Sequence, residues 1–182
     1  QGGHMAVMFG RGDGTFREGP RTSFPGEWLE GFATADLDRD GKPDLVALGA
    51  TGAVVLRGRG DGTFQPPVTY KLAVGYALVV ADITGDGSPD IAVATPGGIT
   101  LLAGLGDGTF QLAGIYGSGK TPSFVAAADF DRDGRTDLIV ATDRSVTPMM
   151  STKQGLVAGV DLPLQGQTVG DVVTGDWNSD GN

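Results

Sequence analysis

Two short motifs return along the chain at a fixed interval, and this repetition restricts the fold more than any other feature. The first is an acidic loop with the pattern Asp-x-Asp-x-Asp-Gly-x-x-Asp. Its copies lie 46 or 47 residues apart and begin at Asp36, Asp82, Asp129 and Asp176. The second motif, GxGDGTF, alternates with the first and begins at Gly10, Gly58 and Gly104. Two interleaved motifs with one period predict a repeat protein.

The acidic loop has the chemistry of a calcium site. In the copy at 36–44, carboxylates stand at positions 1, 3, 5 and 9, and glycine stands at position 6. Alternate residues of a turning loop point at one centre, and calcium takes six to eight oxygen ligands. The first six positions match the loop of helix-loop-helix calcium proteins, but the Glu required at position 12 is absent and Asp44 closes the loop. The loop therefore belongs to another scaffold.

The four loops offer different numbers of ligands. The loops at 36–44 and 129–137 carry four carboxylates, the loop at 82–90 has Thr84 in place of one, and the fourth lacks position 9. We therefore expect calcium in the first and third loops, weaker binding in the second, and an incomplete fourth site. A polar turn without metal is the alternative in each loop. The expected ligands, with the position-7 residue contributing its carbonyl, are Asp36, Asp38, Asp40, Lys42, Asp44, Asp82, Thr84, Asp86, Ser88, Asp90, Asp129, Asp131, Asp133, Arg135, Asp137, Asp176, Asn178 and Asp180.

Each repeat contains four short strand patterns. The continuous apolar run after the acidic loop indicates a strand buried on both faces. Pro66 and Pro67 interrupt the fourth strand of the first full unit, which places that strand at a sheet edge because proline cannot donate to a ladder. In that unit we expect strands at 32–35, 44–48, 53–56 and from Thr63 onward.

Four strands in about 47 residues predict an all-β fold, a β-propeller of four-stranded antiparallel blades. A β-solenoid is the alternative, although its coils are usually shorter. In the third unit the hairpin motif is replaced by residues 151–155, so a different turn is expected there. The predicted divisions are 1–5, the remnant of a cleavable tag that we set aside from the fold; 6–30, half a blade; 31–76, 77–122 and 123–168, whole blades; and 169–182, the first strand and truncated loop of another blade.

The paired motifs resemble the FG-GAP/VCBS repeats of bacterial secreted proteins, which are related to the propeller of integrin α-subunits. The resemblance covers nearly all of residues 6–182. It implies a propeller, usually of seven blades, with calcium bound between the first and second strands of a blade. The family includes adhesion proteins, sugar-binding lectins and propellers attached to enzymes, so the fold alone does not determine function.

Several other features of the sequence exclude or disfavour particular classes of partner and site. A net charge of −9 disfavours nucleic acid and anionic membranes as partners, and no apolar run is long enough to span a membrane. His4 is the single histidine, which excludes a histidine triad or a zinc site. The integrin-type tripeptide at 11–13 and 59–61 belongs to the repeat's own hairpin. The phosphate-loop-like segment 117–121 lacks the following helix.

We expect a non-enzymatic, calcium-stabilised module of a secreted or cell-surface bacterial protein that binds a protein or glycan. The alternative is a lectin or the propeller part of a secreted carbohydrate-active enzyme, with Trp28, Tyr70, Tyr76, Tyr116 and Trp177 as aromatic candidates for sugar stacking. Since the blades would leave apolar faces uncovered, we also expect two copies to complete one ring, the two ends to share a blade, or the arc to stay open.

Overall fold

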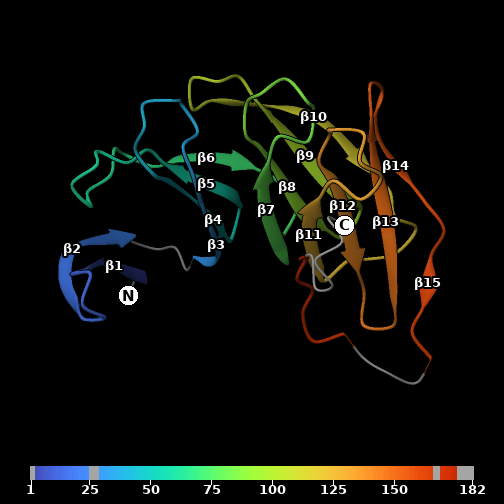
Figure 1. Ribbon diagram of the computed structural model, residues 1–182, viewed down its shortest axis with the longest axis horizontal. Helices are drawn as coiled ribbons and strands as arrows, with labels where there is room; N and C mark the ends of the chain where they lie inside the picture. The colour runs from blue at the N-terminus through green and yellow to red at the C-terminus, as the bar shows by residue number, and fades with distance from the viewer. Residues whose placement is uncertain (1–2, 25–28, 166–168, 176–182) are drawn as a thin grey trace.

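The computed structural model describes residues 3–24, 29–165 and 169–175. Within these residues every regular element is a β-strand. The strands form a two-stranded sheet and three larger antiparallel sheets, which follow one another from β1 and β2 on one side to β13–β15 on the other (Figure 1). No helix in this described part is long and apolar enough to cross a membrane.

Each larger sheet is a meander whose strands pair in chain order, and we call the three sheets blades one, two and three. Blade one consists of β3 (Glu30–Ala35), β4 (Asp44–Gly49), β5 (Gly52–Leu56) and β6 (Val68–Lys71). Blade two consists of β7 (Ala77–Ala81), β8 (Asp90–Thr95), β9 (Gly98–Gly104) and β10 (Phe110–Tyr116). Blade three consists of β11 (Phe124–Ala128), β12 (Asp137–Ala141), β13 (Ser145–Thr152), β14 (Gly155–Ala158) and β15 (Leu162–Pro163), which also pairs with β13.

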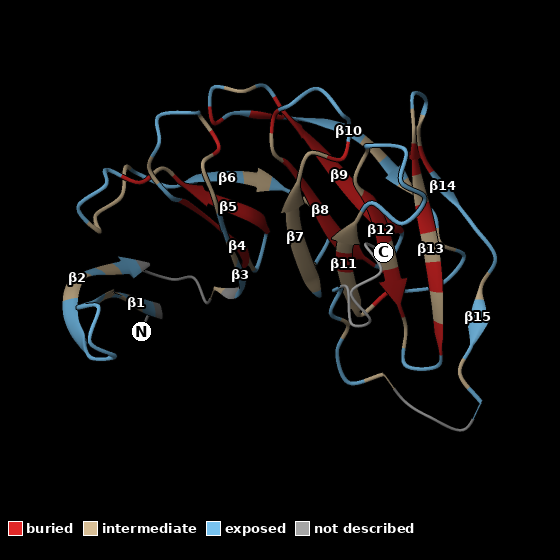
Figure 2. Cartoon of the chain, viewed as in Figure 1, coloured by how far each residue is buried: buried red, intermediate tan, exposed pale blue. Residues whose placement is uncertain are grey.

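The core lies between the blades. The first strands are neighbours, since β7 contacts both β3 and β11. In β8, Ile91 and Val93 join a cluster shared with blade one, whereas Ala92 and Ala94 join a cluster shared with blade three. Successive side chains of a strand point to opposite faces, so a strand between two blades buries every residue. This explains the continuous apolar runs of the sequence and the buried central strands of Figure 2.

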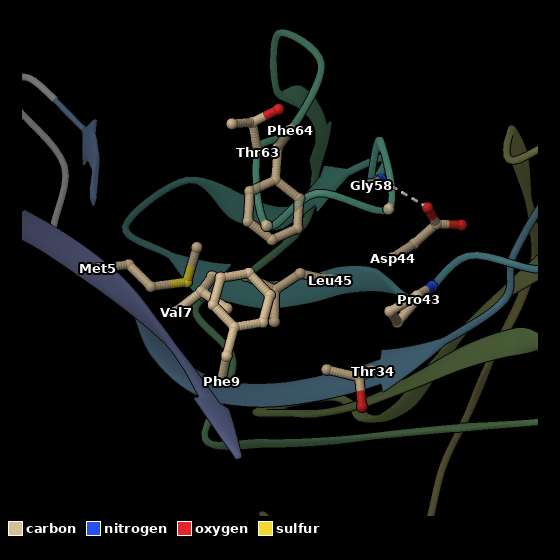
Figure 3. A pocket seen from close by; sticks show the side chains of 12 residues that line it. Met5, Val7, Phe9, Thr34, Pro43, Asp44, Leu45, Gly58, Thr63 and Phe64 are labelled. Atoms are coloured by element: carbon tan, nitrogen blue, oxygen red, sulfur yellow. Dashed lines mark hydrogen bonds between the residues drawn. The ribbon is translucent and has the colours of Figure 1, made fainter. Parts of the chain in front are cut away.

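A two-stranded sheet precedes blade one. It consists of β1 (Gly3–Gly10) and β2 (Phe16–Phe24). Met5, Val7 and Phe9 of β1 lie across from Leu45 and Phe64 of the blade-one region, around a cavity of about 230 Å³ (Figure 3). This pair of strands therefore packs on blade one through apolar side chains.

The fourth strand of blade one begins later than the sequence predicts. Phe64 makes only an isolated bridge to Gly58, and the strand itself begins at Val68, after Pro66 and Pro67. The prolines lack the N–H groups that a ladder needs, so pairing with β5 resumes beyond them. The predicted edge position is confirmed, because β6 pairs with β5 alone in its sheet.

The two ends of the described chain also differ from the prediction. Residues 3–5, which we set aside from the fold, form the start of β1, and the His4 Nδ1 atom lies 3.0 Å from the Ser23 Oγ atom. Residues 169–175 form no strand, although the first strand of a further blade is predicted there. Pairing with β2 explains why residues 3–5 are part of a strand.

The hairpin of blade three differs from the others, as predicted. In the three GxGDGTF hairpins, the Asp side chain accepts hydrogen bonds from the Thr backbone N–H at 2.9 Å. In blade three, the Thr152 hydroxyl instead donates to the Gly155 carbonyl at 2.7 Å and accepts from the Gln154 N–H at 3.1 Å. A hydroxyl has replaced the carboxylate in closing the turn.

Candidate metal-binding loops

The first three acidic loops share one backbone conformation. At position 6, Gly41, Gly87 and Gly134 have φ angles of 79°, 83° and 86°. Position 4 is also left-handed, with φ of 60° at Arg39, 75° at Gly85 and 61° at Arg132. Left-handed backbone is strained for any residue except glycine, so two loops hold an arginine in an unfavourable conformation.

Each loop folds around the carboxylate at position 1. Asp36 accepts the backbone N–H groups of Asp40 at 3.1 Å and Gly41 at 2.9 Å. Asp129 accepts the equivalent groups of Asp133 at 3.1 Å and Gly134 at 2.9 Å. Asp82 does the same with Asp86 at 3.1 Å and Gly87 at 2.8 Å. The sequence thus fixes the turn through its first aspartate and its glycine.

The structure brings carboxylates together in two of these loops. Asp36, Asp38 and Asp40 offer oxygens that all lie within 4.8 Å of one another, and so do Asp129, Asp131 and Asp137. Among the described residues, the loop at 82–90 has no such group. Clustered carboxylate oxygens are the donors that calcium prefers, so the first and third loops fit the ion.

Basic side chains lie beside two of the position-5 carboxylates. Lys42 Nζ lies 2.7 Å from an Asp40 carboxylate oxygen, and Arg135 forms an ion pair with Asp133. The hydrogen bond from Lys42 lowers the pKa of the Asp40 carboxyl, which keeps that group ionised. Lys42 and Arg135 are predicted to contribute their backbone carbonyls, so their side chains have a separate role in balancing the acidic charge.

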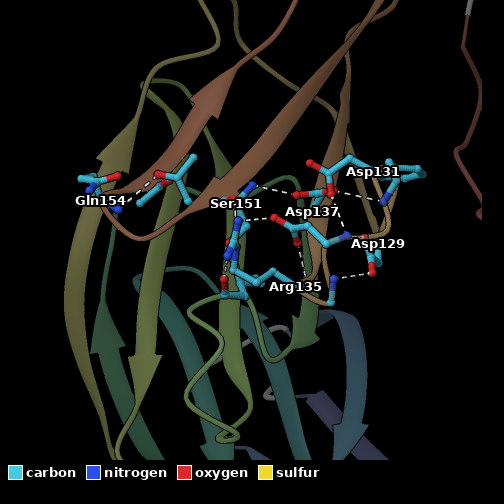
Figure 4. Close-up of polar contacts among 12 residues, drawn as sticks. Asp129, Asp131, Arg135, Asp137, Ser151 and Gln154 are labelled. Atoms are coloured by element: carbon cyan, nitrogen blue, oxygen red, sulfur yellow. Dashed lines mark hydrogen bonds and ion pairs between the residues drawn. The ribbon is translucent and has the colours of Figure 1, made fainter.

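The carboxylate at position 9 serves as a clamp between the loop and the third strand. Asp44 accepts the N–H groups of Leu37 at 2.8 Å and Gly58 at 2.7 Å, one on each carboxylate oxygen. Asp137 accepts those of Phe130 at 3.0 Å and Ser151 at 2.7 Å in the same way (Figure 4). The loop spacing does not predict this role, although the position of each aspartate directly before a buried strand is a signal for it.

Asp90 has the same role and accepts hydrogen bonds from three backbone N–H groups. One of its oxygens accepts the N–H groups of Ile83 at 2.8 Å and Thr84 at 2.7 Å, and the other accepts that of Gly104 at 2.9 Å. Burial raises the pKa of the Asp90 carboxyl, as it does for Asp44, and the N–H donors oppose this rise. Ligation of a metal by these two aspartates stays a prediction. Asp176, Asn178 and Asp180 lie outside the described residues.

The loops also bind to the next blade. The Arg39 guanidinium of blade one's loop donates to the Gly87 carbonyl at 2.7 Å and to the Ser88 Oγ atom at 3.1 Å in the loop of blade two. The carbonyl at position 2 is a second contact point. That of Leu37 accepts the Gly108 N–H at 3.2 Å, and that of Ile83 accepts the Ser151 hydroxyl at 2.6 Å. The first and second loops therefore hold their blades against the next blade through hydrogen bonds.

Two substitutions at Arg39 separate the cost of its left-handed backbone from the loss of its hydrogen bonds to blade two. Both Arg39→Ala and Arg39→Gly remove the contacts to blade two, but only glycine relieves the left-handed backbone. We expect Arg39→Gly to be more stable than Arg39→Ala by about 1 kcal/mol in urea unfolding. The same pair of changes at Arg17, which lies in β2, is the control and should favour alanine. Equal stability of the two Arg39 variants would show that position 4 carries no strain.

The other two motifs behave as structural elements. Asp13 and Asp61 of the integrin-type tripeptides accept hydrogen bonds from Thr15 and Thr63 inside their own hairpins. In the segment 117–121, Lys120 lies 2.6 Å from an Asp161 carboxylate oxygen, and no helix follows in the described chain. The aspartates of both tripeptides and Lys120 therefore have hydrogen-bond partners within the fold.

A second cavity, of about 220 Å³, lies between blades two and three. Tyr116 of β10, Thr84 of the second loop and residues 151–156 line it. Gly155 lets the tyrosine approach, because a Cβ atom there would stand 2.4 Å from the Tyr116 hydroxyl oxygen. The cavity combines an aromatic side chain with polar groups from Thr152, Lys153 and Gln154.

Comparisons with known proteins agree with this architecture. The FG-GAP-like repeat family matches residues 1–47, 36–93 and 82–140. No curated protein matches the chain. A solved structure of an Agrocybe aegerita lectin, described as recognising non-reducing terminal N-acetylglucosamine, is 25% identical with a TM-score of 0.61. The match covers 88% of this chain and 46% of the lectin, so the chain spans less than half of that protein.

A Photorhabdus luminescens Tc holotoxin pore is a more distant neighbour. It is 22% identical with a TM-score of 0.47, over 80% of this chain and 7% of the toxin chain. The lectin match, together with the antiparallel four-stranded sheets, confirms the predicted all-β propeller architecture. Because the repeat matches extend over most of the sequence, the chain belongs to the FG-GAP-like repeat family.

Proposed function

We propose that the chain is a calcium-binding propeller module that acts by binding a partner, without a catalytic step of its own, in a secreted or cell-surface protein. One observation carries this proposal: the first and third acidic loops each gather three carboxylates within 4.8 Å. A bound cation would neutralise carboxylates that otherwise repel one another. Because the first loop donates hydrogen bonds to the loop of blade two, its stabilisation supports the arrangement of these two blades.

Calcium should bind two strong sites and stabilise the fold. At a calcium concentration one hundred times the dissociation constant, each site adds about 2.7 kcal/mol to the free energy of unfolding. Titration calorimetry on chelator-treated protein should give two strong sites, and thermal unfolding should shift upward with calcium. Asp38→Ala and Asp131→Ala should each remove one site.

The matched control is Asp13→Ala, which removes an exposed hairpin carboxylate outside the loops. This variant should keep both sites, and magnesium should bind more weakly because it demands octahedral geometry and keeps its waters. Unchanged stoichiometry in Asp38→Ala and Asp131→Ala would contradict the proposal.

Glycan binding is a second candidate function, favoured by the cavity at Tyr116. An aromatic wall with a few polar groups is the usual composition of a small-ligand site, and the structurally similar lectin recognises N-acetylglucosamine. N-acetylglucosamine should shift the NMR signals of residues 151–156, and Tyr116→Ala should abolish the shifts. Tyr76→Ala, at an exposed tyrosine that does not line this cavity, is the control. Shifts that persist in Tyr116→Ala would place the sugar elsewhere.

A further inference from the structure

Two aromatic rings meet in the contact between blades one and two, beside the GxGDGTF hairpin of blade two. The Tyr70 and Phe110 rings lie edge to face, with their centroids 5.5 Å apart and their planes at 85°. The Tyr70 hydroxyl oxygen accepts the Phe110 N–H at 3.1 Å. Phe110 is buried and belongs to one apolar cluster with Leu37 and Val55 of blade one. A phenyl ring therefore completes this contact.

The strand registers identify the equivalent residues in the contact between blades two and three. Phe110 pairs with Gly104, and the Gly104 N–H donates to the position-9 aspartate of its blade. Leu156 pairs with Ser151, and the Ser151 N–H donates to the position-9 aspartate of blade three. Leu156 therefore stands where Phe110 stands in blade two. By the same registers and loop positions, the counterparts of Tyr70, Val55 and Leu37 are Tyr116, Leu101 and Ile83.

In the contact between blades two and three, these positions surround a cavity. The residues that line the cavity of about 220 Å³ include Ile83, Leu101, Tyr116 and Leu156. Leu156 has no ring, and its turn has four residues, 152–155, where the turn before Phe110 has five, 105–109. In the part of the chain that the structure describes, no aromatic ring stacks on Tyr116. The tyrosine has kept its place, but its phenyl partner is absent.

The size and the lining of the cavity indicate what can enter it. A cavity of about 150 Å³ with aliphatic walls holds benzene, so about 220 Å³ gives room for one ring and a short substituent. The turn supplies polar groups at the wall. Among the described residues, the exposed side chains of Lys153 and Gln154 have no hydrogen-bond or ion-pair partner. A compound with an apolar ring and one polar end therefore matches the site.

We propose that the cavity between blades two and three binds a small aromatic compound. The ring of this compound packs against Tyr116 as the Phe110 ring packs against Tyr70, and its polar substituent faces the turn of blade three. The inference rests on the proposed role of the chain as a binding module, but it does not depend on the sugar named as a second candidate for the same cavity. Edge-to-face aromatic pairs contribute more than the area that they bury, so Tyr116 favours an aromatic ring over a saturated one.

The test compares benzyl alcohol with cyclohexylmethanol, which has the same skeleton but a saturated ring, in NMR titrations of the calcium-loaded protein. Benzyl alcohol should shift the signals of residues 151–156. In Tyr116→Leu, the ratio of the two affinities should fall about two- to tenfold, because leucine keeps apolar bulk but has no ring. The ratio cancels the different hydrophobicity of the free compounds. Tyr76→Leu, at an exposed tyrosine that does not line the cavity, should leave the ratio unchanged.

A second variant supplies the ring from within the chain. Leu156→Phe places a phenyl group where blade two has Phe110, so it should abolish the binding of benzyl alcohol. Leu112→Phe, at a leucine of β10 that is 60% exposed and does not line this cavity, should keep it. The affinity ratio in Tyr116→Leu decides the question if Leu156→Phe does not fold. An unchanged ratio, binding that persists in folded Leu156→Phe, or no shift at residues 151–156 would overturn the proposal.

Titration of the same samples with N-acetylglucosamine separates this inference from the glycan candidate. Shifts at residues 151–156 with benzyl alcohol and none with the sugar would support the aromatic site and contradict the glycan candidate. Shifts with the sugar alone would overturn the aromatic site. Calorimetry counts the calcium sites independently, so failure of the calcium proposal would be recognised separately.

Discussion

Replacing Asp90 by alanine should lower the free energy of unfolding by roughly 3 kcal/mol or more, as measured by urea denaturation in chelator. The carboxylate is fully buried and accepts three backbone N–H groups, from Ile83, Thr84 and Gly104. Alanine leaves these donors without an acceptor, and each unsatisfied buried donor costs about 1–3 kcal/mol. Burial raises the pKa of the Asp90 carboxyl, and the N–H donors oppose this rise.

Replacing Asp90 by asparagine removes one hydrogen-bond acceptor while it keeps the shape of the side chain. Asp90→Asn keeps one carbonyl oxygen for Ile83 and Thr84 but presents an amide NH₂ group to the Gly104 N–H, so the loss should be smaller than for alanine yet clear. Asp86→Ala is the control from the same loop. Asp86 is exposed and accepts the Ser88 N–H at 2.7 Å, so its loss should cost no more than about 1 kcal/mol. If Asp86→Ala cost as much as Asp90→Ala, position 9 would not be a clamp.

Much of the fold could be predicted because the repeat encodes its strands locally. The apolar runs at 45–48 and 91–94 are continuous because each strand is buried on both faces, and the GxGDGTF turns close through their own Asp and Thr side chains. What the sequence did not reveal depends on neighbours. Pairing with β2 makes a strand of residues 3–5, and Pro66 and Pro67 delay β6 until Val68.

The acidic loops could also be predicted in part from the sequence. The spacing placed Asp36, Asp38 and Asp40 in one group, because alternate residues of the turn converge. Spacing could not reveal that Asp44 accepts the Gly58 N–H, since that partner lies beyond the end of β5, outside the loop. The contact of Arg39 with the Gly87 carbonyl was hidden for the same reason, because it joins residues of two repeats.

Ile91→Ala should be the most damaging change in the interface between blades one and two. Ile91 has no exposed surface and packs in one cluster with Val46 and Leu48 of blade one. Truncation of such a side chain removes buried apolar surface and leaves a cavity, so we expect a loss of roughly 3 kcal/mol, within the usual range of about 2–5 kcal/mol.

The same substitution at an exposed site provides a matched control for this prediction. Ile115 of β10 is 62% exposed, so Ile115→Ala should change the free energy of unfolding by less than about 0.5 kcal/mol. Repeat arrays are stabilised by contacts between nearest neighbours, so Ile91→Ala should loosen blade one from blade two first. Hydrogen exchange should then quicken in β4 and β8 while β12 stays protected. Uniform loss of protection would mean that the blades unfold as a single unit.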